Sequence, residues 1–188
     1  MRPVLTFIII LTVARAGAQD TIWMTRSGHV YFISHTSIID IDANHYQVGA
    51  ILNGKTGEMA FSLLMKSFEF TLPLAEEHFN ENYVESEKYP KSTFKGKILD
   101  FQPGRLVEGL DCPVEVEGDL AIHGITKKIR EPGILRREKD GIKATSEFKI
   151  LLDDYRIKVP SIVADRVAMV IPVKVEILFK PMKTTGDR

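Results

Sequence analysis

Cysteine is almost absent from this sequence of 188 residues, in which only Cys112 occurs. A single cysteine cannot form an internal disulfide, so the fold must be stabilised by a buried core. Zinc sites built on Cys-x-x-Cys pairs are excluded, and none of the five histidines belongs to a His-Glu-x-x-His run. We therefore expect no metal site and no cofactor, and we interpret Cys112 as a small buried apolar side chain.

Long apolar runs are also absent, apart from the stretch Val4 to Val13. A membrane-spanning helix needs about 20 apolar residues, so no membrane span is predicted. The stretch follows the basic Arg2 and precedes the small residues Ala16-Gly17-Ala18, as in a cleavable export signal. The sequence thus predicts a signal peptide over residues 1–18, a mature domain over residues 19–188, and a periplasmic or secreted location. A buried N-terminal strand or helix is the alternative interpretation.

An excess of positive charge is the third missing feature. The full chain has 25 basic and 25 acidic residues. Loss of residues 1–18 would remove Arg2 and Arg15 and leave 23 basic residues against 25 acidic ones, a formal charge of −2. Partners such as nucleic acid or an anionic membrane surface require a clear basic excess, so neither is expected.

The main pattern along the sequence is an alternation of apolar and polar residues with a period of two. Phe94, Gly96 and Ile98 alternate with lysines, and the apolar residues of 114–122 alternate with acidic residues. Residues 144–150 and 173–179 repeat this pattern. Such alternation places one face of a strand in an apolar interior and the other in water, which is typical of antiparallel sheets. We count roughly eight to ten strands by these signals, with no linker or internal repeat to divide the single domain.

Turn residues separate the strands. Asn53-Gly54, Ser27-Gly28 and Asp140-Gly141 are predicted to form tight turns or hairpins. Pro103-Gly104 and Pro132-Gly133 are predicted to lie in loops.

One segment departs from the alternation. Residues 74–84 place apolar side chains at helical spacing and carry an acidic pair near their start. Pro73 precedes them and suits a first helical turn. The sequence predicts a short helix here that packs across one end of the sheet.

The fold class follows from the shortage of helices. Because no second helical segment is available to cover an apolar sheet face, we predict that the sheet closes on itself. The fold is then all-β, an antiparallel β-barrel of about eight strands with one short helix, whose interior holds side chains or one small ligand. A transmembrane barrel is the rival, but the outward positions carry Lys and Glu in place of lipid-facing apolar residues.

Two segments carry a family resemblance. Residues 78–96 combine an acidic, aromatic helical stretch with Lys88-Tyr89-Pro90 and a following strand. Residues 116–128 contain the run Gly118-x-Leu120-x-Ile122-x-Gly124-x-Thr126-Lys127. In this order and spacing the two segments resemble the YceI-like family, also called lipid- or polyisoprenoid-binding proteins. The resemblance extends over about residues 20–180 of the chain.

The resemblance implies a lipocalin-like barrel with an elongated apolar cavity that takes an isoprenoid chain. The expected function is therefore an exported binding protein, not an enzyme, that holds a polyisoprenoid or other long-chain lipid for transport or storage. No catalytic residue is assigned, and a homodimer is a possible assembly.

The candidate ligand contacts are apolar residues of the inward faces together with one histidine. Each apolar residue has ordinary core packing as its alternative role. Small inward side chains at Gly96, Gly118, Ala144 and Ser146 favour a hollow interior. His35, in an otherwise apolar stretch, is a candidate donor to a ligand head group. The predicted ligand-binding residues are Phe61, Leu63, Met65, Phe94, Ile122, Phe148, Val175, Ile177 and His35.

Two other functions compete with lipid binding. The first is an envelope interaction or structural module whose barrel is filled by its own side chains, which an interior without a void above about 300 Å³ would favour. The second is an enzyme acting on an apolar substrate, for which only His35, Tyr83 and Tyr89 are candidates. No Gly-x-Ser-x-Gly nucleophile elbow occurs, and His123 is expected to be solvated or bonded to a loop.

Overall fold

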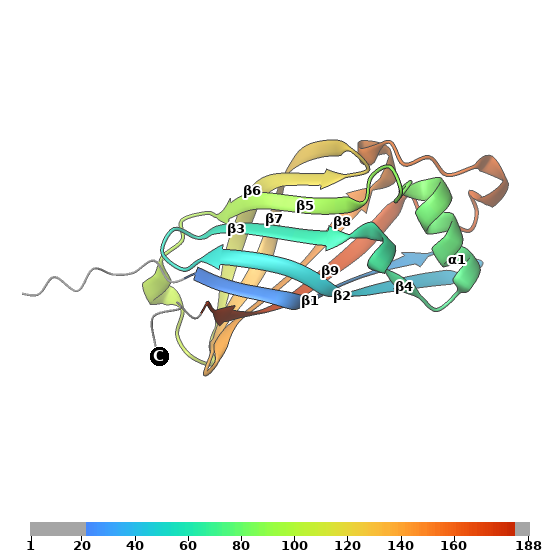
Figure 1. Ribbon diagram of the computed structural model, residues 1–188. Coiled ribbons are helices and arrows are strands. Elements are labelled where there is room, and N and C mark those ends of the chain that lie inside the picture. Colours follow the sequence, from blue (N-terminus) through green and yellow to red (C-terminus); the bar gives the residue numbers. More distant parts are fainter. Residues whose placement is uncertain (1–21, 183–188) are drawn as a thin grey trace, which may run out of the picture.

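Strands account for most of residues 22–182, the part of the chain that the computed structural model describes (Figure 1). The alternation over 94–98, 114–122, 144–150 and 173–179 predicted four of them, and all four are confirmed. The predicted signal peptide lies outside the described residues. The strands are β1 (Ile22–His35), β2 (Asp40–Asn53), β3 (Glu58–Leu64), β4 (Glu69–Phe70), β5 (Lys91–Ile98), β6 (Asp111–Ile122), β7 (Ile125–Glu138), β8 (Gly141–Leu151) and β9 (Val170–Pro181).

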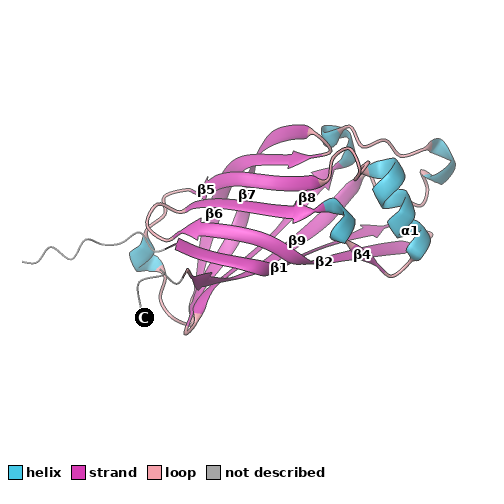
Figure 2. Ribbon diagram, in the orientation of Figure 1, coloured by secondary structure: helices cyan, strands magenta, loops and turns pink. Residues whose placement is uncertain are grey.

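Eight of these strands close into a barrel (Figure 2). Their order is β1-β9-β8-β7-β6-β5-β3-β2, and β2 pairs back with β1, while the two-residue β4 lies against β2. Each of these pairings is antiparallel, and apart from the β1–β9 closure each barrel strand pairs with the next barrel strand in the chain. The predicted antiparallel barrel of about eight strands is confirmed. Closure leaves the eight strands without the unpaired edges of an open sheet.

The predicted helix lies at one end of the barrel. It begins as the α-helix α1 (Pro73–His78) and continues as the wider π-helix η2 (Phe79–Tyr83), so its extent is 73–83 rather than 74–84. The long β8–β9 connection reaches the same end and contains the short 3₁₀ helices η4 (Leu152–Tyr155) and η5 (Ser161–Val163) (Figure 1). Two further 3₁₀ turns are η1 (Met65–Ser67) and η3 (Pro103–Arg105). Within residues 22–182 no helix has the length and apolar character needed to cross a membrane.

Two of the predicted turns are wrong. Ser27-Gly28 lies inside β1, where the register with β2 shifts on both sides of Gly28. This glycine forms part of a β-bulge, and a Cβ added there would collide with Ile177 of β9. Pro132-Gly133 lies inside β7, on a stretch that pairs with β6. The predicted turns at Asn53-Gly54 and Asp140-Gly141 are confirmed as the β2–β3 and β7–β8 connections.

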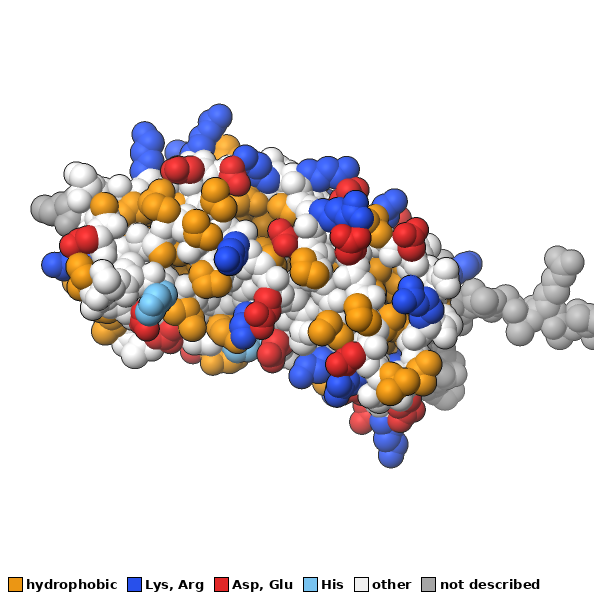
Figure 3. Space-filling model, turned by 180° about the vertical axis from the view of Figure 1, so that it is seen from behind, with side chains coloured by type: hydrophobic (Ala, Val, Ile, Leu, Met, Phe, Trp, Pro, Cys, Tyr) orange, Lys and Arg blue, Asp and Glu red, His pale blue; other side chains and the backbone are white. Residues whose placement is uncertain are grey.

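The outer face of the barrel is charged, as the alternation indicates. Figure 3 shows acidic and basic side chains over one side of it, interspersed with apolar ones. Several form cross-strand ion pairs, among them Arg130–Glu115 at 2.6 Å and Arg136–Asp111 at 2.7 Å. Their hydrogen bonds hold the pKa of Glu115 and of Asp111 below the usual carboxyl values. Exposed pairs of this kind contribute little stability, so the interior must supply most of it.

The interior is filled at the end away from α1. Leu52 and Phe179 are fully buried there, and Ile98, Leu135 and Ile142 are each 2% exposed. These residues come from the ends of five different strands that meet at this end of the barrel. Their contacts form a packed core. Toward α1, by contrast, the inward side chains do not fill the space between them.

Candidate functional site

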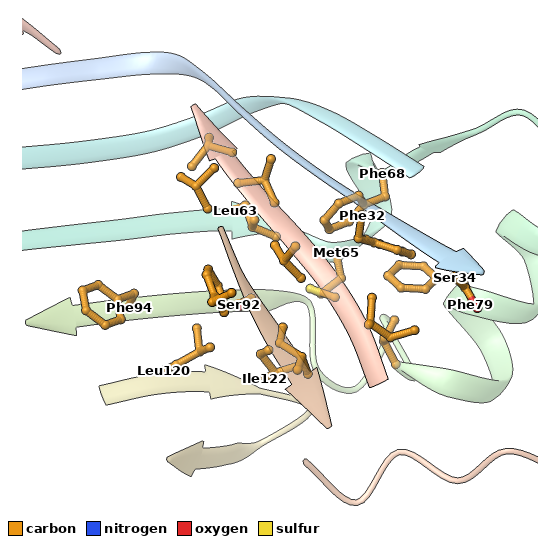
Figure 4. A pocket seen from close by; sticks show the side chains of 18 of the residues that line it. Phe32, Ser34, Leu63, Met65, Phe68, Phe79, Ser92, Phe94, Leu120 and Ile122 are labelled. Carbon is orange, nitrogen blue, oxygen red and sulfur yellow. The ribbon is translucent and has the colours of Figure 1, made fainter. Parts of the chain in front are cut away.

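An apolar cavity of about 560 Å³ occupies the barrel toward the end covered by α1. In Figure 4, Leu63, Phe94, Leu120 and Ile122 lie along three strands around this space. The helical segment and the β8–β9 connection complete the wall with residues such as Phe79, Ile157 and Val167. Strand residues that line it include Val30, Phe32, Val48, Met59, Phe61, Leu63, Phe94, Val114, Val116, Leu120, Ile122, Phe148, Ile150, Ile171, Val173, Val175 and Ile177.

Eight of the nine predicted ligand-binding residues line this cavity. They come from β3 and the following turn, and from β5, β6, β8 and β9, so the barrel brings together residues that are more than 100 positions apart. Their common position follows from the parity of the alternation, which directs every second side chain inward. The eight are Phe61, Leu63, Met65, Phe94, Ile122, Phe148, Val175 and Ile177. Their contact with a ligand stays a prediction.

His35 does not line the cavity, contrary to the expectation that it faces a ligand. It is the last residue of β1, and the inward position there belongs to Ser34. The His35 side chain is 76% exposed and pairs with Asp40 across the β1–β2 turn. The apolar residues earlier in this stretch, such as Phe32 and Ile33, suggested burial, but strand parity directs His35 outward.

Four phenylalanines form an aromatic cluster at the α1 end, and the sequence analysis did not assign them to the site. Phe32 of β1 lies 5.3 Å from Phe68, 5.9 Å from Phe70 and 5.8 Å from Phe79, measured between ring centroids. Phe79 in turn lies 5.0 Å from Phe70 and 5.5 Å from Phe68. Figure 4 shows three of these rings beside the helix. These ring contacts join the helical segment to the strands. The segment that covers the cavity is therefore held in place by aromatic packing.

A buried histidine supports this cluster. His45 of β2 is fully buried, and its Nδ1 accepts a hydrogen bond from the Gln47 backbone N–H at 3.1 Å. Nε2 must therefore carry the proton that it donates to the Leu64 carbonyl at 3.1 Å. Burial lowers the pKa of His45, which agrees with a neutral ring. Its ring lies 5.1 Å from that of Phe68, so His45 helps to position the cluster.

The two inward glycines of β5 and β6 do not leave the empty space that the sequence suggested. Gly96 and Gly118 pair across β5 and β6, and a Cβ added at either would lie 2.6 Å from Phe94 Cζ. The Phe94 ring therefore occupies the space that these glycines leave, and the hollow expected there is wrong. Phe94 also lies 6.0 Å from Phe61, and the two rings border the cavity on the side of the packed core. Ala144 and Ser146 do line the cavity.

A polar cluster anchors the segment that follows the helix. His123, in the β6–β7 turn, pairs through Nε2 with Glu85 Oε2 at 2.7 Å and through Nδ1 with the Tyr155 carbonyl at 3.0 Å. The prediction that His123 is bonded to a loop is confirmed, and it bonds to two. The hydrogen bond from His123 holds the pKa of Glu85 below the usual carboxyl value. The Tyr89 ring packs edge-on against His123 at 4.7 Å, so three connections meet at this histidine.

The three residues considered for catalysis lie apart. Tyr83 lines the cavity, Tyr89 packs against His123, and His35 pairs with Asp40 on the outside. Burial raises the pKa of Tyr83 above its ordinary value.

Cys112 is half-buried against the core rather than fully buried, which corrects the expectation for this residue. Among residues 22–182, no group of three or more His, Cys, Asp or Glu side chains is arranged to hold a metal ion.

Solved structures of low sequence identity share this fold. A polyisoprenoid-binding domain from Saccharophagus degradans, implicated in plant cell wall breakdown, is 14% identical and has a TM-score of 0.76 over 87% of this chain and all of its own. BcnA of Burkholderia cenocepacia is 14% identical, with a TM-score of 0.65 over 81% of this chain and 95% of its own. The YceI protein of Campylobacter jejuni is 15% identical, with a TM-score of 0.62 over 96% of this chain and all of its own.

Sequence comparison identifies the family directly. No curated protein matches the chain. The family model of the YceI-like domain, however, matches residues 25–179, which comprise all eight barrel strands except the outermost residues of β1 and β9. That match extends over far more than half of the chain and contains both motifs that carry the resemblance. The protein therefore belongs to the family of YceI-like domains.

Proposed function

We propose that this protein is an exported carrier that holds a polyisoprenoid or another long-chain lipid in the barrel cavity, for transport or storage. The observation that carries the proposal is the cavity itself, about 560 Å³ in volume and lined mainly by apolar side chains. This volume lies inside the range of about 300–1,000 Å³ that is usual for ligand pockets.

The chemistry of the lining suits a flexible hydrocarbon. Each buried CH₂ group contributes about 0.8 kcal/mol, so a long chain can be held without a strong polar contact. Met65 adapts to an unbranched or methyl-branched partner because its flexible thioether fills irregular gaps, and the surrounding phenylalanines supply apolar contact area. The Saccharophagus degradans domain of the same fold is described as polyisoprenoid-binding, which supports this ligand class.

Apolar residues continue from the cavity to the surface at the helix. Leu72 and Leu74 line the cavity and are 39% and 62% exposed. Apolar surface that continues from a cavity to the outside is typical of a ligand entrance. We infer that lipid enters beside α1.

The export step rests on the sequence alone. The signal predicted over residues 1–18 leads to a periplasmic or secreted location, where a carrier of apolar lipid would operate between membranes. Cell fractionation with the full-length chain tests this part, and retention of uncleaved protein in the cytoplasm would contradict it.

The alternative function, an envelope interaction or structural module whose barrel is filled by its own side chains, required an interior without a void above about 300 Å³. The cavity exceeds that limit, so we do not propose the module as a second function.

The binding proposal is tested by lipid mass spectrometry and a pair of variants. Organic extraction of the protein purified from its host should release a stoichiometric isoprenoid or similar lipid. Leu63→Trp fills the cavity and should abolish co-purification, because Leu63 lines it. Leu64→Trp is the matched control, since Leu64 is the next residue of β3 and is 48% exposed. Lipid-free wild-type protein, also after incubation with membrane lipids, would overturn the proposal.

A further inference from the structure

The wall of the barrel is incompletely bonded at one place. β7 pairs with β6 from Ile125 to Arg136, but it pairs with β8 only from Ile134↔Thr145 to Glu138↔Gly141. β8 continues its pairing with β9 through Leu151. Between residues 125–133 of β7 and 146–151 of β8, the ladder of backbone hydrogen bonds is therefore interrupted.

Pro132 explains where the ladder stops. Its carbonyl accepts a hydrogen bond from Ser146 Oγ of β8 at 2.7 Å, so the polar groups of this residue face β8. In an antiparallel strand the N–H and C=O of one residue point the same way, and proline has no N–H to donate. The side chain of Ser146 replaces one backbone bond, and no β7–β8 backbone pairing follows. The proline that the sequence analysis placed in a loop thus marks an opening in the β7–β8 ladder, a break in its backbone hydrogen bonds where η4 lies against both strands.

Glu131 faces the cavity at this opening. It lies between Ile129 and Gly133 on the inward face of β7, and all three line the cavity. It is the only acidic residue among the described residues that line it. Its carboxylate forms no hydrogen bond or ion pair with other residues of 22–182. Because the residue is only partly buried, water or a ligand must supply the donors that compensate its charge.

The surroundings of Glu131 favour a neutral donor. Burial raises the pKa of its carboxyl above the usual value. Burial and the nearby charges of Asp154 and Glu131 raise the pKa of Tyr155 to about 12, which places the Tyr155 phenol within electrostatic reach of Glu131. Beside Glu131 a second anion, such as a ligand carboxylate or phosphate, would be repelled. Arg166, the one Lys or Arg among the described residues that line the cavity, is exposed in the β8–β9 connection, where solvent screens its charge. A hydroxyl group would supply the missing hydrogen-bond donor.

We propose that Glu131, at the opening between β7 and β8, is a polar subsite that receives the hydroxyl of a long-chain alcohol. The cavity then selects isoprenoid alcohols over the matching acids, and the hydrocarbon chain runs from Glu131 toward the aromatic cluster beside α1. The inference rests on the proposed lipid-binding function and names the ligand class of that cavity.

Three ligands of equal chain length test the assignment. Geranylgeraniol carries a hydroxyl donor, its methyl ether carries none, and geranylgeranoic acid carries a negative charge at neutral pH. Each is titrated as a competitor of the neutral fluorophore N-phenyl-1-naphthylamine, with delipidated protein. The wild type should bind the alcohol about tenfold more tightly than the ether, the size of one hydrogen bond to a charged group. The acid should bind most weakly.

Variants of Glu131 distinguish the contribution of its carboxylate to binding from that of the apolar cavity. Glu131→Leu should bind the alcohol and the ether equally, and Glu131→Gln should lose the discrimination against the acid while it keeps an acceptor for the alcohol. Glu115→Gln is the matched control: Glu115 of β6 pairs with Pro132, belongs to the outward face and bonds to Arg130. It should behave like the wild type.

The outcomes distinguish this inference from the proposed function. Equal binding of all three ligands by the wild type, or an alcohol preference that persists in Glu131→Leu, overturns the role of Glu131 and leaves lipid binding intact. Failure of every ligand to displace the fluorophore from both the wild type and Glu131→Leu overturns lipid binding together with this subsite.

Discussion

The two ends of the barrel interior are built from the same strands but are closed in different ways. Away from α1, Leu52, Ile142 and Phe179 from three strands are at most 2% exposed and belong to the packed core. Toward α1, the inward side chains border a cavity of about 560 Å³. The first end is closed by the strands themselves, and the second by a helix that aromatic rings join to the barrel.

This difference shows how one alternating pattern serves stability and binding together. Packed side chains at one end hold the strands in register, so the other end can stay hollow without loss of the fold. Phe61 and Phe94 stand at the boundary, because Phe61 contacts Phe179 of the packed core at 6.2 Å and also lines the cavity. Substitutions on either side of that boundary should have different consequences.

The largest contrast is expected between two leucine truncations. Leu52→Ala removes a fully buried side chain and should lower the free energy of unfolding by about 2–5 kcal/mol, since it leaves a new void. Leu63→Ala enlarges an existing cavity and should cost about 1 kcal/mol. Urea denaturation of both delipidated proteins measures the difference. Equal losses would show that the α1 end is packed as tightly as the other end.

A smaller effect is expected from the glycines beneath Phe94. Gly118→Ala places a Cβ against the backbone of β5 and 2.6 Å from Phe94 Cζ, so it should destabilise the protein by about 1–3 kcal/mol. Gly104→Ala is the control, because nothing lies within 4 Å of a Cβ there, and it should change stability by less than about 0.5 kcal/mol. Thermal unfolding measures both. If Gly118→Ala is also neutral, both the Phe94 ring and the facing β5 backbone shift without cost, and the boundary is not tightly packed.

The parts predicted from sequence are those that depend on local periodicity. The alternation over 94–98, 114–122, 144–150 and 173–179 determines which side chains of four strands point inward. Five candidate site residues could therefore be placed in the cavity before their partners were known: Phe94, Ile122, Phe148, Val175 and Ile177. The helix after Pro73 could be predicted for the same reason, because its spacing is local.

The parts that failed depend on contacts between distant segments. Gly28 and Pro132 are turn formers in isolation, yet the neighbouring strands retain both within β1 and β7 as a bulge and an interrupted ladder. Phe79 could not be assigned to the site, because its contacts come from β1, β4 and the loop before β4. The glycines at 96 and 118 suggested empty space, but only the cross-strand register shows that the Phe94 ring lies over them.

The smallest effect concerns the carboxylate in the hollow end. Burial raises the pKa of Glu131 above its ordinary value of 4.5, so the folded state favours the protonated form. Its ionised form therefore lowers stability once the pH exceeds the unfolded-state pKa, and this penalty is complete above the folded-state pKa. Glu131→Leu should raise Tm near neutral pH by about 2–4 °C, the shift that about 1 kcal/mol produces in a domain of this size.

The pH dependence distinguishes this effect from simple gain of apolar packing. As the pH falls toward about 4, near the unfolded-state pKa of a glutamate, the wild type becomes protonated and the advantage of Glu131→Leu should shrink. Glu115→Gln should not gain stability at neutral pH, because its hydrogen bond with Arg130 holds the pKa of Glu115 below the ordinary value. A gain in Glu131→Leu that is constant across this pH range would mean that the carboxylate stays hydrated in the folded state. The hollow end would then be wet at Glu131, in contrast to the dry core at the other end.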